Sequence, residues 1–164
     1  DLEEWSEGIW KACQDAGKET KAHAGEFGGA ENVREVIERL KVRRVQHGVR
    51  SVEDESVVQL LIDEGVTLDV CPISNVKLQV VSSMKEHPIR QLFDRGINCT
   101  ISTYDSFSFG NTVTDEYRAL AQELNFTKDE LAQISRNGFK IAQLDEAKRR
   151  QIFDEIDAAL LDVA

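Results

Sequence analysis

The chain has 164 residues, of which 41% are hydrophobic and only two are proline, values typical of a folded globular protein with a sizeable core. Thirty acidic side chains against twenty basic ones give a formal net charge of −10, which argues against nucleic-acid binding because phosphate contacts need clustered Lys and Arg. The three cysteines are widely spaced with no C-x-x-C pair, so we expect a reducing cytoplasm and neither a disulfide framework nor a zinc knuckle.

Hydrophobic periodicity predicts alternating helices and strands over the first 102 residues. In chain order, we expect a helix over 2–16, a strand over 19–24, a helix over 31–40, a strand over 42–46, a helix over 51–65, a strand over 66–71, a helix over 88–96 and a strand over 97–102. Trp5, Ile9 and Cys13 stand at four-residue spacing, which predicts that this face of the first helix packs on the core. Ser51 with Asp54 resembles a capping box and is expected to begin the third helix.

The rest of the chain is expected to be helical. We predict helices over 115–124, 128–137 and 146–161, the second behind a Thr127/Glu130 capping box, with a short turn over 139–143. Strands separated by helices require a parallel sheet, so the prediction is an α/β fold in a single domain, 1–164, with extra C-terminal helices. Four parallel strands cannot close a barrel and leave two edges unpaired. We therefore expect these edges to bind either a second copy of the chain or a separate N-terminal half-barrel.

The two ends of the chain carry no sign of a membrane or secretory segment. No apolar run approaches the roughly 18 residues that a membrane span needs, so we expect no membrane partner. The N-terminus lacks the basic and apolar regions of a signal peptide. Because the chain begins at Asp1 instead of methionine, we expect it to be a fragment or a processed product.

Polar side chains stand where the first two predicted strands end. His23 and His47 are expected on neighbouring strands, which lie roughly 5 Å apart in a sheet. Glu26 follows Gly25, which lets the backbone turn sharply after the first strand. Two histidines and a carboxylate suit metal-assisted hydrolysis, in which a cation lowers the pKa of bound water and the carboxylate moves protons. The sequence therefore predicts a catalytic site at the carboxyl ends of the strands.

Several of these side chains have a purely structural alternative. His23 is alternatively a buried histidine that binds backbone carbonyls, and Glu26 is alternatively a cap of the following helix. We interpret His87, which precedes a proline, as a helix-start residue and assign it no site. Phe107 and Phe109 fit equally well as the lining of a substrate pocket and as packing for the loop that carries them.

Four segments, in this order, resemble the motifs of the adenosine deaminase family. The segments are His23-Ala24-Gly25-Glu26, Gln46-His47-Gly48-Val49-Arg50, Cys71-Pro72-Ile73-Ser74-Asn75, and Ser102-Thr103-Tyr104-Asp105 followed by Phe109-Gly110. The resemblance covers nearly all of this chain but only the C-terminal half of the family's zinc-bearing TIM barrel. It implies a zinc-dependent purine deaminase that removes an exocyclic amino group from adenosine, adenine or a related purine and releases ammonia.

The resemblance also implies a role at each matched position. His23 stands at a zinc ligand, and Glu26 stands at the acid/base that passes a proton to the purine ring. His47 matches the histidine that orients and helps to activate the attacking water. Gly25 and Asp105 match substrate-binding positions, and the aspartate is expected to hydrogen-bond a purine ring nitrogen.

Two departures from the family pattern limit what this chain is expected to do alone. Tyr104 occupies the position of an aspartate ligand, and a phenol with an ordinary pKa of about 10 is a poor substitute for a carboxylate near 3.9. The His-x-His pair of the family's first strand has no counterpart here. A catalytic zinc generally needs three protein ligands, so we expect weak or absent zinc binding and little or no activity from the isolated chain. The alternative is a non-catalytic, degenerate half-barrel that serves as an interaction or assembly module.

Overall fold

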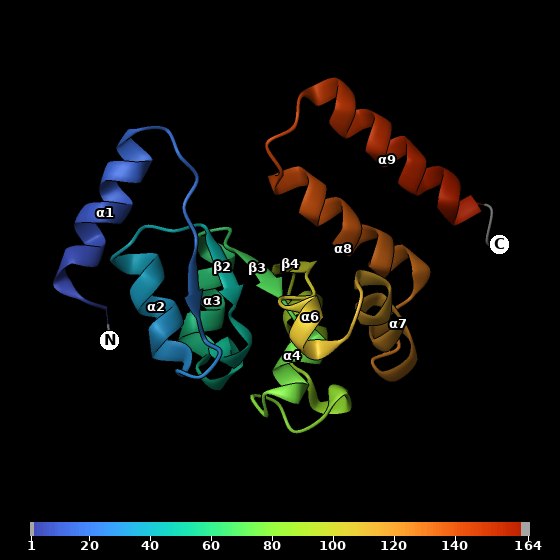
Figure 1. The fold of residues 1–164 in the computed structure, drawn as a ribbon, viewed down its shortest axis with the longest axis horizontal. Helices are drawn as coiled ribbons and strands as arrows, with labels where there is room; N and C mark the ends of the chain where they lie inside the picture. Colours follow the sequence, from blue (N-terminus) through green and yellow to red (C-terminus); the bar gives the residue numbers. More distant parts are fainter. Residues whose placement is uncertain (1, 162–164) are drawn as a thin grey trace.

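A computed structural model describes residues 2–161 and contains one parallel sheet in the order β1-β2-β3-β4 (Figure 1). The strands are β1 (Ala22–Ala24), β2 (Arg44–His47), β3 (Thr67–Val70) and β4 (Asn98–Ile101). The connections between them contain α2 (Ala30–Glu38), α3 (Glu55–Asp63), α4 (Pro72–Lys77) and α5 (Ile89–Asp94), with short 3-10 helices η1 (Val49–Glu53) and η2 (Met84–Glu86). The predicted α/β architecture of four parallel strands alternating with helices is confirmed, and β1 and β4 form the two edges.

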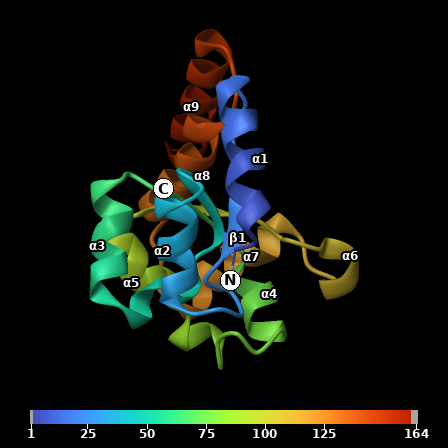
Figure 2. The ribbon, with the colours of Figure 1, turned by 90° about the vertical axis from the view of Figure 1, so that its left-hand side faces the viewer.

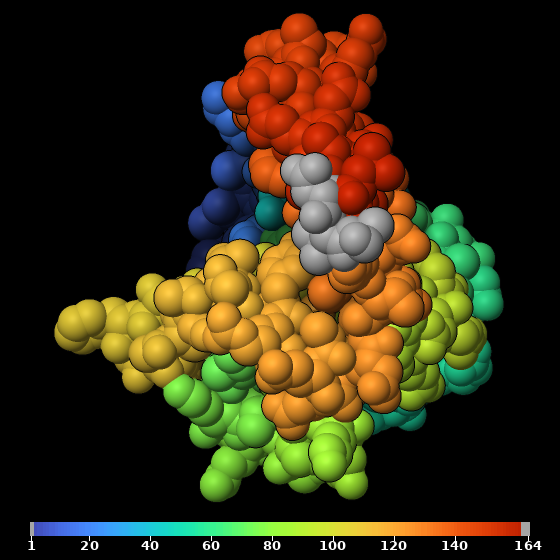
Figure 3. Space-filling view, turned by 90° about the vertical axis from the view of Figure 1, so that its right-hand side faces the viewer, coloured from blue at the N-terminus to red at the C-terminus, as the bar shows by residue number. Residues whose placement is uncertain are grey.

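The remaining helices lie at the two ends of the sheet and beyond it. They are α1 (Glu4–Asp15), α6 (Ser106–Phe109), α7 (Val113–Glu123), α8 (Lys128–Ile141) and α9 (Glu146–Leu161). Helix α1 stands on the β1 side, whereas α8 and α9 lie beyond β4 (Figure 1). The short helix α6 projects away from the body of the molecule, as Figures 2 and 3 show. None of the helices in residues 2–161 is long and apolar enough to cross a membrane.

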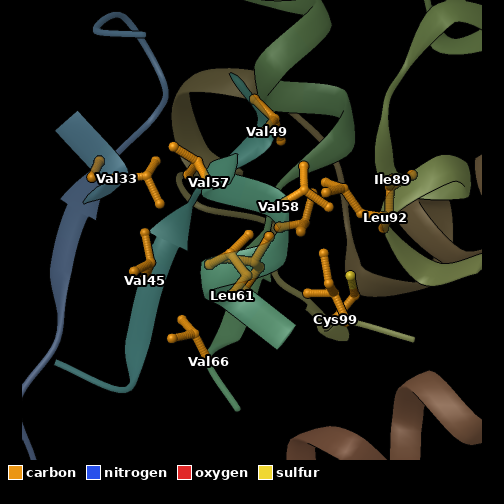
Figure 4. Packing of buried hydrophobic residues seen from close by; sticks show 14 of the residues in the cluster. Val33, Val45, Val49, Val57, Val58, Leu61, Val66, Ile89, Leu92 and Cys99 are labelled. Carbon is orange, nitrogen blue, oxygen red and sulfur yellow. The ribbon is translucent and has the colours of Figure 1, made fainter. Parts of the chain in front are cut away.

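One face of the sheet is apolar and packs against the helices. The pairing register aligns Val45, Leu68 and Cys99 across β2, β3 and β4, and all three are fully buried. Leu61 from α3 and Leu92 from α5 pack into the same cluster (Figure 4). Complete burial of one such aliphatic side chain contributes about 1.5–3 kcal/mol. The core thus lies on the helix-covered face of the sheet.

The opposite face of the sheet carries a polar row centred on a buried carboxylate. The row runs across all four strands as His23, Gln46, Asp69 and Thr100. Thr100 Oγ1 donates to Asp69 Oδ1 at 2.7 Å, while Arg44 Nε and Lys21 Nζ donate to Oδ2 at 2.7 and 3.0 Å. Burial opposes ionisation of Asp69, but these three donors outweigh it and lower the pKa. Asp69 is therefore an anion that links β3 to β2, β4 and the segment before β1.

The structure corrects the predicted core-facing side of α1. Trp5 and Ile9 are 61% and 50% exposed, whereas Ser6 is buried and Trp10 packs against the core. Apolar residues occur on two adjoining faces of this helix, and periodicity alone selected the wrong one. The contacts of α1 with the core and with the chain after α2, where Arg39 donates to Glu7 and Gln14 to the carbonyl of Leu40, are tertiary interactions that decide which face is covered.

The predicted start of the third helix is also wrong. Ser51 lies in η1, where its Oγ donates to the carbonyl of Gly48 at 2.7 Å. Asp54 is the N-cap of α3, and its Oδ1 accepts from the amide of Ser56 at 2.8 Å. Either hydroxyl or carboxylate oxygen satisfies a free helix amide, so the sequence pattern does not choose between them.

The capping box of Thr127 and Glu130 is confirmed at the start of α8. Helices α4 and α6 were not predicted, because six and four residues are too short to show a period.

A buried glutamate joins α7 to the beginning of α4. Glu116 is fully buried, and its carboxylate accepts from the amide of Ile73 at 3.0 Å and from Nδ2 of Asn111 at 2.8 Å. Burial raises the pKa of Glu116 to about 7, with Asp115 adding to the rise and the two hydrogen bonds and Lys77 opposing it. The carboxyl group therefore titrates close to neutral pH in the folded protein.

We expect this glutamate to make the free energy of unfolding fall as pH rises. Its folded pKa of about 7 exceeds the ordinary 4.5, so its contribution is complete below pH 4.5 and is lost as pH rises to about 7. The loss amounts to roughly 3 kcal/mol. Glu116→Gln is the non-titrating reference. It keeps the packing of the site, because the side chain of Asn111, whose Oδ1 has no partner, can turn to accept from the new amide.

Urea unfolding of both proteins across this pH interval measures the effect. The difference between wild type and Glu116→Gln removes the contributions of all other titrating groups. If the free energies of unfolding of the two proteins changed with pH in parallel, the prediction would be wrong.

Candidate active site

Three aromatic side chains gather at the carboxyl ends of the strands. The ring of His23, from β1, lies 5.5 Å from that of His47, at the end of β2, between centroids. The ring of Tyr104, which follows β4, lies 5.9 Å from His23 and 5.1 Å from His47. The structure thus brings together the two histidines and the tyrosine that the sequence placed at strand ends.

A left-handed backbone turns His47 toward this cluster. The register pairs His47 with Ala24 and His23 with Gln46, so regular alternation would direct the two histidines to opposite faces. His47 has φ of 68°, which ends the strand and breaks this alternation. Tyr104 has φ of 61°. Such conformations cost roughly 1–2 kcal/mol for a residue with a Cβ and concentrate at functional sites.

Two glycines hold the loops after β1 and β2 close together. Gly25 has φ of 64°, and a Cβ built there would lie 2.5 Å from Val33 Cγ2 and 3.1 Å from the Cα of Gly48. The amide of Gly48 donates to the carbonyl of Ala24 at 2.9 Å, and the amide of Arg50 donates to the carbonyl of Gly25 at 3.0 Å. This backbone contact fixes the place of Glu26 relative to His47.

Glu26 faces the site and does not cap a helix. The N-cap of α2 is Gly29, which has no side-chain cap. Glu26 is buried, with Oε2 at 3.4 Å from Nε2 of His47, and burial raises the pKa of its carboxyl group. Neither Oε1 of Glu26 nor Nε2 of His47 makes a hydrogen bond. Buried polar atoms without partners are rare, and this pair marks a place for a polar ligand.

Both histidines are neutral near neutral pH. His47 is fully buried, and burial lowers its pKa to about 4, with His23 and Lys21 adding to the fall. Burial, and then Lys21, also lowers the pKa of His23, although this side chain remains exposed. Neutral imidazoles keep one bare nitrogen, which suits them to bind a metal ion or to take part in directional hydrogen bonds.

Two residues that the sequence did not assign to the site lie behind His47: Asn75 contacts His47, and His87 contacts Asn75. Asn75 Nδ2 lies 3.2 Å from His47 Nδ1, and Asn75 Oδ1 lies 3.3 Å from His87 Nε2. His87 Nδ1 accepts from the amide of Ile89 at 3.1 Å, so its interpretation as a helix-start residue is correct but incomplete. Asn75 lies in a recognised motif, whereas His87 is separated from His47 by 40 positions with no local pattern to connect them.

Asp105 begins α6 as its N-cap. Its Oδ1 accepts from the amide of Ser108 at 3.0 Å and its Oδ2 from Oγ of Ser108 at 2.5 Å, and these bonds lower its pKa. Both oxygens therefore already bind α6, and the expected bond to a purine nitrogen stays a prediction. Phe109 stacks on Tyr104 with centroids 6.3 Å apart, whereas Phe107, also in α6, is 97% exposed.

The described residues do not form a complete zinc site. Within residues 2–161, no group of three or more His, Cys, Asp or Glu side chains is placed to hold a metal ion. Among the described residues of the site, His23 offers an exposed imidazole, and Tyr104 offers an exposed phenol in place of a carboxylate. Because catalytic zinc generally needs three protein ligands, this donor set is too small.

Comparison with known proteins supports the family resemblance. The sequence profile of the adenosine deaminase family matches residues 5–159. An adenine deaminase from Hahella chejuensis is 38% identical over 152 residues, covering 93% of this chain and 46% of that protein. A second adenine deaminase, from Wolinella succinogenes, is 39% identical over 150 residues, or 92% of this chain and 45% of that protein. The chain therefore spans less than half the length of the curated relatives it matches.

Solved structures give the same extent of similarity. The crystal structure of adenine deaminase from Arthrobacter aurescens superposes with a TM-score of 0.89 and 34% identity, over 94% of this chain and 47% of that one. An amidohydrolase from Burkhoderia ambifaria, solved with bound Zn, gives a TM-score of 0.78 and 26% identity over 99% of this chain and 49% of that one. These overlaps confirm the predicted fold class, half of a TIM barrel.

The close approach of the two loops predicts a large effect of Gly25→Ala. An added methyl group would be destabilising for two reasons. The left-handed backbone costs a residue with a Cβ roughly 1–2 kcal/mol, and the methyl group would collide with Val33 and the Gly48 backbone. Gly17 is a matched control, with φ of 70° and nothing within 4 Å of the position that a methyl group would take. We expect Gly25→Ala to lower the free energy of unfolding by at least ~1 kcal/mol more than Gly17→Ala in urea titrations. Equal losses would show that the loops are not tightly joined.

Proposed function

Because this chain belongs to the adenosine deaminase family, we propose that it forms the C-terminal half of a zinc-dependent purine deaminase. The observation that carries this proposal is the buried pair of Glu26 and His47 beside His23, with unpartnered polar atoms on both members of the pair. We favour adenine as the substrate because the curated relatives are adenine deaminases. The products would be ammonia and the corresponding oxo-purine.

Each side chain in the pair has a distinct task in this proposal. The raised pKa of Glu26 lets its carboxyl group hold a proton and deliver it to a purine ring nitrogen as an oxygen attacks the carbon that bears the amino group. His47 is neutral and orients the attacking oxygen. In this proposal the backbone of Gly25 contacts the purine, and the carboxylate of Asp105 has lone pairs left for a protonated ring nitrogen.

We propose that polypeptide beyond the described residues completes the metal site. His23 supplies one ligand, and Tyr104 stands at the position of another. The unpaired edges of β1 and β4 are where the strands of an N-terminal half-barrel would add. In this proposal the described residues act as one domain in the cytoplasm, consistent with free thiols at Cys13, Cys71 and Cys99, and neither nucleic acid nor a membrane is a partner.

A second candidate function is a non-catalytic interaction or assembly module. The phenol of Tyr104 favours this candidate, because it removes an anionic ligand from the site. The same sheet edges, β1 and β4, would then bind a second copy of the chain. Sedimentation equilibrium at micromolar concentration separates the two cases, since self-association is expected only for the module and a monomer would count against it.

Zinc titration by calorimetry tests the number of ligands. We expect the wild-type chain to bind zinc weakly, with a dissociation constant above the micromolar range, because three protein ligands are not available. Tyr104→Asp should tighten binding at least tenfold, since it restores a carboxylate beside His23. Tyr104→Phe is the control and should not tighten it. Tight stoichiometric binding by wild type would contradict the proposed incompleteness.

Reconstitution tests the deaminase activity itself. The partner is the part of the Hahella chejuensis adenine deaminase that lies outside the match, co-expressed with this chain carrying Tyr104→Asp. We expect ammonia release from adenine by the zinc-loaded complex and none from either part alone. Glu26→Gln should lower the rate at least 100-fold, because an amide cannot deliver the proton. A stable, zinc-containing complex that deaminates neither adenine nor adenosine would overturn the proposal.

A further inference from the structure

A continuous line of hydrogen-bonded side chains connects the first turn of α5 to the site. It begins at the amide of Ile89, passes through His87 and Asn75, and ends at His47, which faces Glu26. We propose that His87 is a positioning residue that, through Asn75, holds His47 in the tautomer with its proton on Nε2. The catalytic meaning of this tautomer rests on the proposed deaminase function, but its existence does not.

The direction of the line is set at its first bond. A backbone N–H can only donate, so Nδ1 of His87 is bare where it accepts from Ile89 at 3.1 Å. His87 is 2% exposed and neutral, since burial lowers its pKa to about 3. Its single proton therefore lies on Nε2, which donates to Oδ1 of Asn75 at 3.3 Å.

The amide of Asn75 transmits this direction to His47. With Oδ1 toward His87, the Nδ2 group of Asn75 donates to Nδ1 of His47 at 3.2 Å. The flipped amide would set two donors against each other at His87. His47 then accepts at Nδ1 and, being neutral, carries its proton on Nε2.

Burial keeps water from supplying alternative partners to these hydrogen-bonding groups. Asn75 and His47 are fully buried, as His87 nearly is, so any reversed bond would leave two buried donors or two buried acceptors facing each other. Such a mismatch costs the desolvation of both groups. Because the bond from the Ile89 amide cannot reverse, the two bonds that follow it are fixed in direction as well.

The Nε2 proton decides what His47 contributes to the site. This nitrogen lies 3.4 Å from Oε2 of Glu26 and makes no completed hydrogen bond. As an N–H group it donates to an oxygen placed between the two side chains and cannot take a proton from it. His47 then orients the oxygen, and proton transfer is left to Glu26.

Nitrogen-15 NMR of the histidine-labelled chain measures the tautomers directly. In the wild type we expect His47 and His87 each to show a protonated Nε2 and a bare Nδ1, assigned by comparison with single histidine variants. This measurement needs no substrate, zinc or partner. Protonated Nδ1 on either residue would overturn the proposal without bearing on the deaminase activity.

Two substitutions of His87 distinguish its role in positioning His47 through Asn75 from its local role at the start of α5. His87→Gln places an amide donor where Nε2 stood and keeps the bond to Asn75, while it loses the bond to Ile89. His87→Asn places an oxygen where Nδ1 stood and keeps the bond to Ile89, while it loses the bond to Asn75. If His87 only starts α5, His87→Asn is the neutral variant; if it positions His47, His87→Gln is.

We expect His87→Gln to retain the wild-type His47 spectrum and His87→Asn to shift the tautomer ratio by roughly two- to tenfold, the range that one ordinary hydrogen bond supports. Asn75→Asp should protonate Nδ1 of His47, because a carboxylate there can only accept. An unchanged His47 spectrum in folded His87→Asn or Asn75→Asp would overturn the proposal. If a variant does not fold, the wild-type tautomers still decide the question.

In the reconstituted complex, a positioning role predicts a lower kcat for His87→Asn with little change in KM, and recovery in His87→Gln. Failure of the complex to deaminate at all would remove the proposed function while leaving the tautomer result intact.

Discussion

The carboxylate of Asp69 is the interaction on which the carboxyl edge of this sheet depends. It accepts from side chains of Arg44 in β2, Thr100 in β4 and Lys21 in the segment before β1. On the far face, aliphatic packing holds the strands to helices but does not set one strand's position along its neighbour. A buried anion with three directional donors does so, because a shift of any strand would leave charge without a partner.

Alignment of the strands places the loops, and the loops place the site. With β1 and β2 aligned, Gly25 and Gly48 meet backbone to backbone, and this contact fixes Glu26 opposite His47. The left-handed turn at His47 is then required, since an extended residue there would direct its ring away from His23. Strain at this position is therefore part of how the cluster forms.

The resulting site is ordered on one side and open on the other. Behind His47, hydrogen bonds through Asn75 and His87 reach the backbone of α5. In front of it, Nε2 of His47 and Oε1 of Glu26 have no partners. An arrangement that satisfies the polar atoms behind His47 and leaves those facing the site free is prepared for a ligand.

The sequence by itself determined the alternation of four strands with helices, the cluster of polar residues at strand ends, and the family, because periodicity and motifs are local properties. It did not reveal which face of α1 is covered, that Asp54 and not Ser51 caps α3, or that His87 reaches the site. The first and third depend on contacts between residues far apart in the chain, whereas the cap depends on local backbone geometry that a pattern of residue types does not specify. The predicted convergence of His23 and His47 is observed, but it depends on a left-handed backbone at His47 that strand alternation does not predict and that only the tertiary structure revealed.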